Sequence, residues 1–502
     1  MSLYCALRAP VNDDDVYHLH SIWLVAQGNL PYKGFFEIHP PGLWLVLSPV
    51  AAVFSSPSRY VLTARAATAV ILALIVWLAA RTVRATWLQE AVLTVLALGI
   101  MTRCQIWTFR AEYVAMLLFM LHVYLLAGMN AAAVVRPLFA AAFLGLACTM
   151  SIRLLPFLAL QPITVLCVAA RAPKRQAINW VAGLLLGAAP TIFYLTRHQL
   201  WTDMWFWAFR FVASLDVVRW GVEIGRAEMV IACLGMAAAA QVFRGKALPR
   251  PGRVVVTAAW VLAFLFHLAN PQKVDFAALS LLLTTAILLT ALVPLIWTGV
   301  SVASRDAAII TVAVGTIFFA RLITPVSLPF DRQTQRTQLL VLNWLGEIAG
   351  SEPVVLIAPY HPMIARDATD LQNAWYYSFW LDSRAIRERL RSFASAVLDD
   401  PPPIIAADPW MEYTGGRDLP AWLNRANVLT PSQLETVRTM LADRYAIVAF
   451  PLLAADHGLP FGHQFWVRID RLATHLPPRP FTVTRGPQVA GNAAPAPTER
   501  RP

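Results

Sequence analysis

The chain has 502 residues, of which 58% are apolar and 14% are charged, and its mean hydropathy is +0.56. A soluble globular protein carries about a quarter charged residues, so this composition excludes a chain whose only solvent is water. The net charge of +12 would suggest nucleic-acid binding in a soluble protein. Here much of the positive charge lies in short loops between apolar blocks, where it sets membrane orientation, so no nucleic-acid partner is expected.

The N-terminal segment, residues 1–58, contains two apolar stretches that are too short to cross a membrane. They cover residues 16–27 and 41–54, whereas a spanning helix needs about 20 residues. Both are predicted to be helices that lie in or near the membrane interface.

Ten longer apolar blocks follow over residues 59–324, and their lengths of about 17 to 25 residues suit helices that cross the bilayer. They begin near Arg59, Trp87, Phe109, Val134, Ile152, Ile178, Ala227, Val254, Val274 and Ala307. Basic residues gather in alternate loops, which the positive-inside rule assigns to the cytoplasm. These are Arg81 and Arg84, Arg136, Arg171 with Lys174 and Arg175, Arg244 with Lys246, Arg250 and Arg253, and Arg305. The opposite loops, residues 1–58 and everything after Pro325 are then predicted to be external.

The C-terminal part is richer in proline and charge and has no apolar run long enough to span a membrane. Short buried strands are predicted at residues 353–358, 403–407 and 446–450, and helices near residues 334–348, 383–397 and 431–444. This pattern predicts an extracytoplasmic α/β domain over residues 325–476. The Pro/Ala-rich composition of residues 477–502 predicts a disordered tail.

The densest polar cluster lies in the N-terminal segment, where residues 12–20 read NDDDVYHLH and residues 28–41 read GNLPYKGFFEIHPP. One interpretation is a solvated loop with acidic residues at a helix N-terminus. However, Asp14, Tyr17 and His18 share one face of a helix that starts near Asp15. Glu37 and His39 follow on a proline-stiffened loop that is placed to meet that face, which favours a functional site at the membrane surface.

This pattern resembles the GT-C type lipid-dependent glycosyltransferases of bacteria, which are related to protein O-mannosyltransferases and to aminoarabinose transferases that act on lipid A. The shared features are an acidic pair, a Tyr or His, an interfacial helix and then G-x-x-P-Y-x-x-F-x-E-x-H-P-P. The matching residues are Asp14, Asp15, His18, Gly28, Pro31, Tyr32, Phe35, Glu37, His39, Pro40 and Pro41. The chain departs from the pattern at Gly34, where relatives usually have Asp or Asn, and at Ile38, which is apolar. It is also expected to lack the family's first membrane helix, which should precede the acidic pair.

The resemblance implies a GT-C-like multi-pass fold in a bacterial inner membrane, with the active site and the C-terminal domain on the periplasmic or outer side. It implies transfer of a sugar from a polyprenyl-phosphate donor to a hydroxyl of a lipid, glycan or protein of the cell envelope, such as lipopolysaccharide. Asp14 would be the general base, with Asp15 and Glu37 as further catalytic candidates. The candidates for substrate binding are Tyr17, His18, Tyr32, His39, Arg110, Arg153, Arg210 and Lys273. The four basic residues among them are candidates for the leaving phosphate, although basic and aromatic residues near a membrane also serve as interfacial anchors.

Three alternatives stay open. Asp15, Glu37 and His39 have the ligand chemistry to hold a divalent metal ion, although their spacing matches no known metal motif. A lipid or sugar transporter would need charged or helix-breaking residues at mid-membrane, whereas polar groups here gather at one surface. A non-catalytic assembly subunit would use the C-terminal domain as an interaction module. No residue identifies the sugar or the acceptor.

Overall fold

The structure is a computed structural model whose elements fall into two compact units. Met1–Lys33, Glu37–Ser55 and Arg59–Gln335 form the helical unit, and Gly34–Phe36, Ser56–Ser58 and Arg336–Pro502 form the C-terminal unit. The structure describes residues 7, 9, 11, 13–35, 37–103, 108–128, 135–168, 173–211, 226–244, 248–269, 278–297, 302–323, 332–356, 398–406, 430–449, 464–479 and 481–485.

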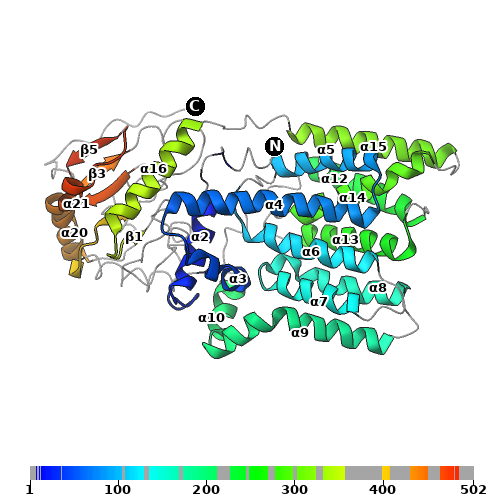
Figure 1. The fold of residues 1–502 in the computed structure, drawn as a ribbon, viewed down its shortest axis with the longest axis horizontal. Helices are drawn as coiled ribbons and strands as arrows, with labels where there is room; N and C mark the ends of the chain where they lie inside the picture. Colours follow the sequence, from blue (N-terminus) through cyan, green and yellow to red (C-terminus); the bar gives the residue numbers. More distant parts are fainter. Residues whose placement is uncertain are drawn as a thin grey trace. The chain divides into compact units, whose positions relative to one another are not determined.

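The two short apolar stretches of the N-terminal segment both form helices, α2 (Asp13–Ala26) and α3 (Gly42–Ala51). The two helices pack against each other, and both lie near the end of the helical unit where α4 begins (Figure 1). The acidic residues occupy the first turn of α2, where negative charge is favourable beside the positive end of the helix dipole.

Each of the ten predicted membrane blocks contains a helix, which confirms the prediction of a helical membrane domain. In chain order they are α4 (Pro57–Val83), α5 (Trp87–Arg103), α6 (Ala111–Ala127), α7 (Val135–Cys148), η1 with α8 (Ile152–Ala159, Leu160–Val168), α9 (Pro173–Arg197), α12 (Arg226–Arg244), α13 (Arg250–Ala269), α14 with η5 (Leu279–Leu292, Val293–Ile296) and α15 (Val302–Ile323). Between α9 and α12 lie α10 (Trp201–Trp205) and the π-helix η2 (Phe206–Phe211).

Within the described residues, five helices are long and apolar enough to cross a bilayer. They are Pro57–Val83, Pro173–Arg197, Arg250–Leu268, Leu279–Ile296 and Val302–Arg321, and shorter apolar helices account for the other blocks. The chain is therefore an α-helical multi-pass membrane protein.

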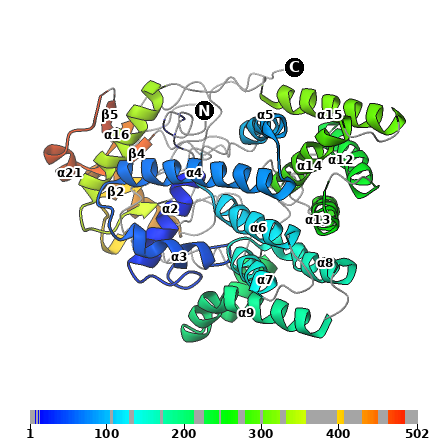
Figure 2. The same cartoon turned by 45° about the vertical axis from the view of Figure 1, so that its right-hand side comes forward.

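Several loops that the charge pattern predicts to be external meet at one end of the helical unit. Asp15 contacts Arg65 near the start of α4 and the backbone of Phe109 just before α6. The N–H of Gly42 donates to the carbonyl of Thr149, after α7, at 2.8 Å. Lys33 donates to the carbonyl of Gln199, after α9, at 3.3 Å. Loops with the same predicted side thus share one end, as Figures 1 and 2 show for α2 and α3 beside the start of α4.

Close packing of α7 against α9 depends on glycine. A Cβ at Gly187 would lie 1.9 Å from the carbonyl oxygen of Ala142, and one at Gly183 would lie 2.3 Å from that of Leu138. The two glycines are four residues apart on α9, the small-residue spacing that lets membrane helices approach closely.

The described residues of the C-terminal unit form three helices and a five-stranded sheet. The helices are α16 (Arg332–Ala349), α20 (Pro431–Arg444) and α21 (Ile469–Thr474), and the strands are β1 (Val355–Leu356), β2 (Ile404–Ala406), β3 (Tyr445–Ala449), β4 (Gln464–Arg468) and β5 (Thr482–Arg485). The sheet order is β1-β2-β4-β3-β5, in which only the β1–β2 pair is parallel.

The predicted strands at 353–358, 403–407 and 446–450 match β1, β2 and β3, and the helices predicted near 334–348 and 431–444 match α16 and α20. The helix predicted near 383–397 lies outside the described residues. The prediction of disorder from residue 477 is wrong for Thr482–Arg485, because these residues pair with β3 as strand β5. Composition alone missed β5 because its backbone hydrogen bonds come from a strand far away in the sequence.

Candidate active site

Asp15, at the start of α2, is fully buried and joins three parts of the helical unit. Its Oδ2 accepts hydrogen bonds from Nε and Nη2 of Arg65 at 3.1 and 2.5 Å. Its Oδ1 accepts one from the backbone N–H of Phe109 at 2.5 Å. Arg65 is also fully buried and donates to the carbonyl of Ala9 at 2.6 Å. These contacts give Asp15 a structural role, because a carboxylate enclosed in this way cannot reach an acceptor in solution or in the bilayer.

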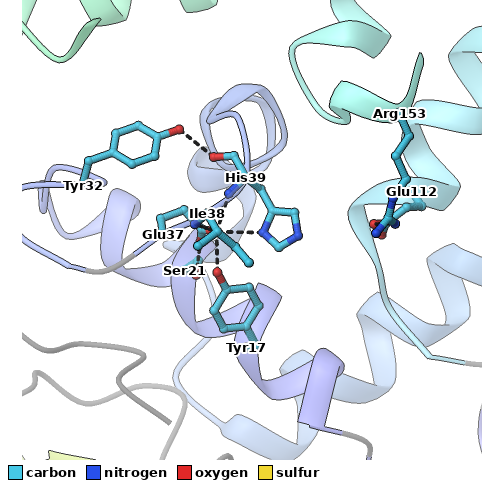
Figure 3. Close-up of polar contacts among 8 residues, drawn as sticks. All are labelled: Tyr17, Ser21, Tyr32, Glu37, Ile38, His39, Glu112 and Arg153. Atoms are coloured by element: carbon cyan, nitrogen blue, oxygen red, sulfur yellow. Dashed lines mark hydrogen bonds and ion pairs between the residues drawn. The ribbon is translucent and has the colours of Figure 1, made fainter. Parts of the chain in front are cut away.

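Glu37 organises the loop between α2 and α3, as Figure 3 shows. Its Oε1 accepts a short hydrogen bond from the hydroxyl of Tyr17, and its Oε2 accepts one from Ser21 at 3.1 Å. The backbone N–H groups of Ile38 and His39 donate to Oε1 at 2.9 and 3.0 Å, and Nδ1 of His39 lies 2.8 Å from the same oxygen. Glu37 is fully buried, so its carboxylate holds the loop to α2 and is not available as a base.

The loop itself turns through an uncommon backbone conformation. Tyr32 has a φ of +71°, in the left-handed region that non-glycine residues rarely adopt. Its buried hydroxyl donates to the carbonyl of His39 at 2.6 Å, and burial raises the pKa of this phenol well above its ordinary value. A protonated hydroxyl at this position is a donor, which fits its bond to the His39 carbonyl.

The pKa values of two histidines beside this loop are shifted in opposite directions because their surroundings differ. Burial alone would lower the pKa of His39, but the hydrogen bond to Glu37 and the Glu37 charge outweigh that effect and raise it. Burial, followed by the nearby His39 charge, lowers the pKa of His18 to about 4. The two rings lie 5.3 Å apart. His18 is 2% exposed, and its Nδ1 has no hydrogen-bond partner among the described residues.

Two ion pairs complete the cluster. Asp14 pairs closely with Arg110, the residue before α6, and Arg153 Nη1 lies 2.7 Å from Oε1 of Glu112 in the first turn of α6. In Figure 3 the His39 ring lies between the Glu37 loop and the Glu112–Arg153 pair. The charge of Glu112 acts on Asp14, His18 and His39, so the pairs and the histidines form one electrostatic unit.

Asp14 is the carboxylate of this cluster that keeps access to its surroundings, since 20% of its side chain is exposed. Burial raises its pKa, the Arg110 charge opposes part of that rise, and the charges of Glu112 and Asp15 add to it. A carboxylate with a raised pKa is a stronger base than a solvated one. The site can therefore accept a proton at Asp14 while the other carboxylates hold the geometry.

The structure brings most of the predicted site residues together, but one basic candidate is not part of the cluster and another lies outside the described residues. Asp14, Asp15, Tyr17, His18, Tyr32, Glu37, His39, Arg110 and Arg153 lie within the set of contacts described above. Arg210, on η2, is exposed, and no contact among the described residues joins it to either ion pair. Lys273 lies outside the described residues.

The predicted metal site of Asp15, Glu37 and His39 does not form. Within the part of the chain that the structure describes, no group of three or more His, Cys, Asp or Glu side chains is placed to hold a metal ion. Asp15 points to Arg65, whereas Glu37 and His39 bond to each other. The carboxylate oxygens of Asp15 and Glu37 and Nδ1 of His39 thus have protein partners.

Arg65 and Ser21, which hold Asp15 and Glu37, were not predicted from the sequence. Arg65 had a usable signal, because it is a charge inside an apolar block, where charges are costly unless they are paired. Ser21 had none, since a serine one turn after Tyr17 has no distinctive pattern.

No family model matches the chain, and no curated protein matches it in sequence. One similar solved structure is that of the oligosaccharyltransferase of Archaeoglobus fulgidus, tethered with an acceptor peptide containing the NVT sequon via a disulfide bond. That likeness has a TM-score of 0.45 and 11% sequence identity, and it covers 95% of this chain and 72% of the archaeal chain. A similarity of this size does not assign a family or an activity.

Proposed function

We propose that the chain is a membrane glycosyltransferase of the GT-C type that moves a sugar from a polyprenyl-phosphate donor to a hydroxyl of a lipid, glycan or protein. The observation that carries the proposal is the partly exposed Asp14 carboxylate, held by Arg110 beside the Glu112–Arg153 pair at one end of a membrane helical bundle. By the positive-inside rule that end faces outward, on the periplasmic side if the membrane is a bacterial inner membrane.

In the proposed reaction, the acceptor oxygen forms a bond to the sugar carbon C1 while the bond from C1 to the donor phosphate breaks. The acceptor proton passes to the Asp14 carboxylate, and the leaving polyprenyl phosphate keeps the bonding electron pair. General base catalysis of this kind contributes about 10²-fold to 10⁴-fold to a rate. The buried carboxylates have other tasks: Asp15 anchors α2 through Arg65, and Glu37 holds His39 in place.

The leaving phosphate needs positive charge that is not already neutralised. Arg110 and Arg153 each face a carboxylate, so they can orient phosphate oxygens but add little net charge. We infer that a cation outside these pairs supplies the remaining positive charge for the leaving phosphate, and Arg210 and Lys273 are the candidates. Arg210 is exposed on the aromatic-rich helix η2, at a level where a lipid headgroup can approach.

The test is transfer of a radiolabelled sugar from a polyprenyl-phosphate donor by the purified full chain. Asp14→Asn should lower the rate by about 10²-fold to 10⁴-fold because it removes the base, while the variant still inserts in the membrane. Asp203→Asn is the matched control. Asp203 is a half-exposed acid that pairs loosely with Lys33, at 3.7 Å, at the same end of the helical unit, so its variant should keep normal activity.

The same assay separates the alternatives. Full activity in Asp14→Asn would contradict Asp14 as the base. A wild-type chain that transfers no sugar would favour the assembly subunit. Movement of the lipid-linked sugar across vesicles without transfer would favour the transporter.

A further inference from the structure

A polar cavity of about 420 Å³ lies at the other end of α6 from the carboxylates, where the ends of α4 and α6 meet the starts of α5 and α7. Its walls include Arg81, Arg84, Arg136, Glu90 and Tyr124. Among the described lining residues, three cations against one carboxylate give this arginine pocket an excess of positive charge. Its volume lies in the range of small-molecule binding sites.

Arg84 ends α4 in a backbone conformation that glycine usually adopts. Its φ is +54°, its N–H donates to the carbonyl of Arg81 at 3.2 Å, and the N–H of Ala85 donates to that of Ala80 at 2.9 Å. This is the hydrogen-bond pattern of a Schellman C-cap, in which the left-handed residue is most often glycine. The backbone of this turn therefore does not require an arginine, whose side chain places an exposed guanidinium at the pocket wall.

Arg136 is held over the end of α6. Its Nη1 donates to the carbonyl of Gly128 at 2.6 Å, and a Cβ at residue 128 would lie 2.7 Å from the same nitrogen. Glycine at this position thus lets the guanidinium approach the helix end. Among the described residues, one hydrogen bond orients the group, and a guanidinium has five N–H donors, so further donors are available to a ligand.

Aromatic side chains place this pocket at the level of lipid headgroups. The guanidinium carbon of Arg81 lies 5.6 Å from the centroid of the Trp77 ring. Trp77 is 50% exposed and Trp87, at the start of α5, is 79% exposed. Exposed tryptophans beside arginines at helix ends are typical of the membrane interface. The positive-inside rule assigns this end to the cytoplasmic leaflet, which is rich in anionic lipids.

We propose that the arginine pocket binds the phosphodiester headgroup of an anionic phospholipid. Guanidinium groups pair two N–H donors with two phosphate oxygens, which favours arginine over other cations in such a site. The exposed Trp77 and Trp87 rings flank the acyl chains outside the pocket. This site is separate from the carboxylate cluster at the other end of α6 and does not depend on the proposed activity.

The experiment uses the full chain purified in a mild detergent and titrated with dioleoylphosphatidylglycerol, with binding followed as a rise in the thermal unfolding midpoint. Parallel titrations use dioleoylphosphatidylcholine and inorganic phosphate. Arg84→Gly is the informative variant, because it removes a charge and at the same time gives the turn its preferred residue, so weaker binding cannot come from a damaged fold. Arg81→Gln provides a second test, and Arg175→Gln, an exposed arginine near the start of α9 and outside the pocket, is the matched control.

The anionic lipid should raise the midpoint, and Arg84→Gly and Arg81→Gln should each require about fivefold more of it for the same effect, which is the usual contribution of one basic residue at an anionic surface. Arg175→Gln should respond like the wild type. Unchanged lipid binding in both pocket variants, an equal loss in the control, or an equal effect of phosphatidylcholine would overturn the proposal. An equal effect of inorganic phosphate would mean that the pocket binds free phosphate and not a lipid.

Discussion

The two ends of α6 use charge in different ways. At its start, Arg110 and Arg153 each face a carboxylate, Asp14 and Glu112 respectively. At its end, three arginines line one pocket, where Glu90 is the single carboxylate among the described lining residues. Paired charges hold each other in a fixed geometry, which suits a site that carries out chemistry. Unbalanced charges attract an ion of opposite sign, which suits a site that only binds.

The largest expected effect tests the buried pair of Asp15 and Arg65, which lies beside the start of α6. Asp15→Asn should leave the buried Arg65 charge without compensation and lower the free energy of unfolding by about 3–5 kcal/mol. The measurement is the thermal unfolding midpoint of the full chain in detergent. A double variant, Asp15→Asn with Arg65→Met, should recover much of the loss, because no uncompensated charge remains.

The control for this prediction is the exposed pair between Lys33 and Asp203. Loss of that pair in Asp203→Asn should cost less than about 1 kcal/mol. Equal unfolding midpoints for Asp15→Asn and Asp203→Asn would contradict the structural role of Asp15.

The second prediction concerns the acid stability of the same end. Burial lowers the pKa of His18 to about 4 in the folded chain from its ordinary value of 6.5, so the unfolded chain binds the proton more tightly. Stability should therefore fall as the pH drops from 6.5 towards 4, by on the order of 3 kcal/mol at most. His18→Asn should remove this part of the pH dependence, as measured by unfolding midpoints between pH 4 and 7.

His39 contributes to the pH dependence of stability with the opposite sign. Its pKa is raised in the folded chain, so the stability that it contributes is lost as the pH rises through that value. Subtracting the pH profile of the His18→Asn unfolding midpoints from that of the wild type cancels most of the His39 contribution. His198→Asn, at the end of α9 outside the cluster, serves as control. If wild type and His18→Asn have the same pH profile, His18 is not held neutral by burial.

The third prediction concerns the chemistry of Asp14. Because its pKa is raised above 3.8, kcat/KM for sugar transfer should fall on the acid side with an apparent pKa above that value, by about tenfold for each pH unit below it. Arg110→Gln should move the acid side of this pH–rate profile to still higher pH, because the Arg110 guanidinium opposes the rise in the Asp14 pKa. An acid side that stays in place in Arg110→Gln would indicate that another group titrates.

The smallest expected effect tests the arginine pocket at the end of α6. Arg84→Gly should stabilise the lipid-free chain by about 1 kcal/mol, because glycine adopts a left-handed conformation without the Cβ penalty. Arg84→Ala, which removes the charge but keeps the Cβ, should not give this gain. The unfolding midpoints of the two variants in lipid-free detergent provide the measurement, and a midpoint for Arg84→Gly below that of Arg84→Ala would contradict the strain at this turn.

Most of the helical architecture could be predicted from sequence because its causes are local. Apolar length predicts each membrane helix, and ten predicted blocks correspond to helices from α4 to α15. The short apolar stretches similarly predicted α2 and α3, and the strand patterns predicted β1, β2 and β3. Strand β4, which pairs with both β2 and β3, was not predicted, because the sequence pattern did not distinguish residues 464–468 from the residues around them as a strand.

The sequence by itself determined that this is a membrane protein, which loops share a side, and that carboxylates and histidines gather before the first long helix. Only the tertiary structure decided what each of these groups does. Asp14 and Asp15 are neighbours in the chain, but successive residues of a helix point about 100° apart. One side chain therefore meets a buried arginine fifty residues away, while the other stays partly open beside Arg110. The arginine pocket likewise depends on four helix ends coming together, and no local pattern contains that information.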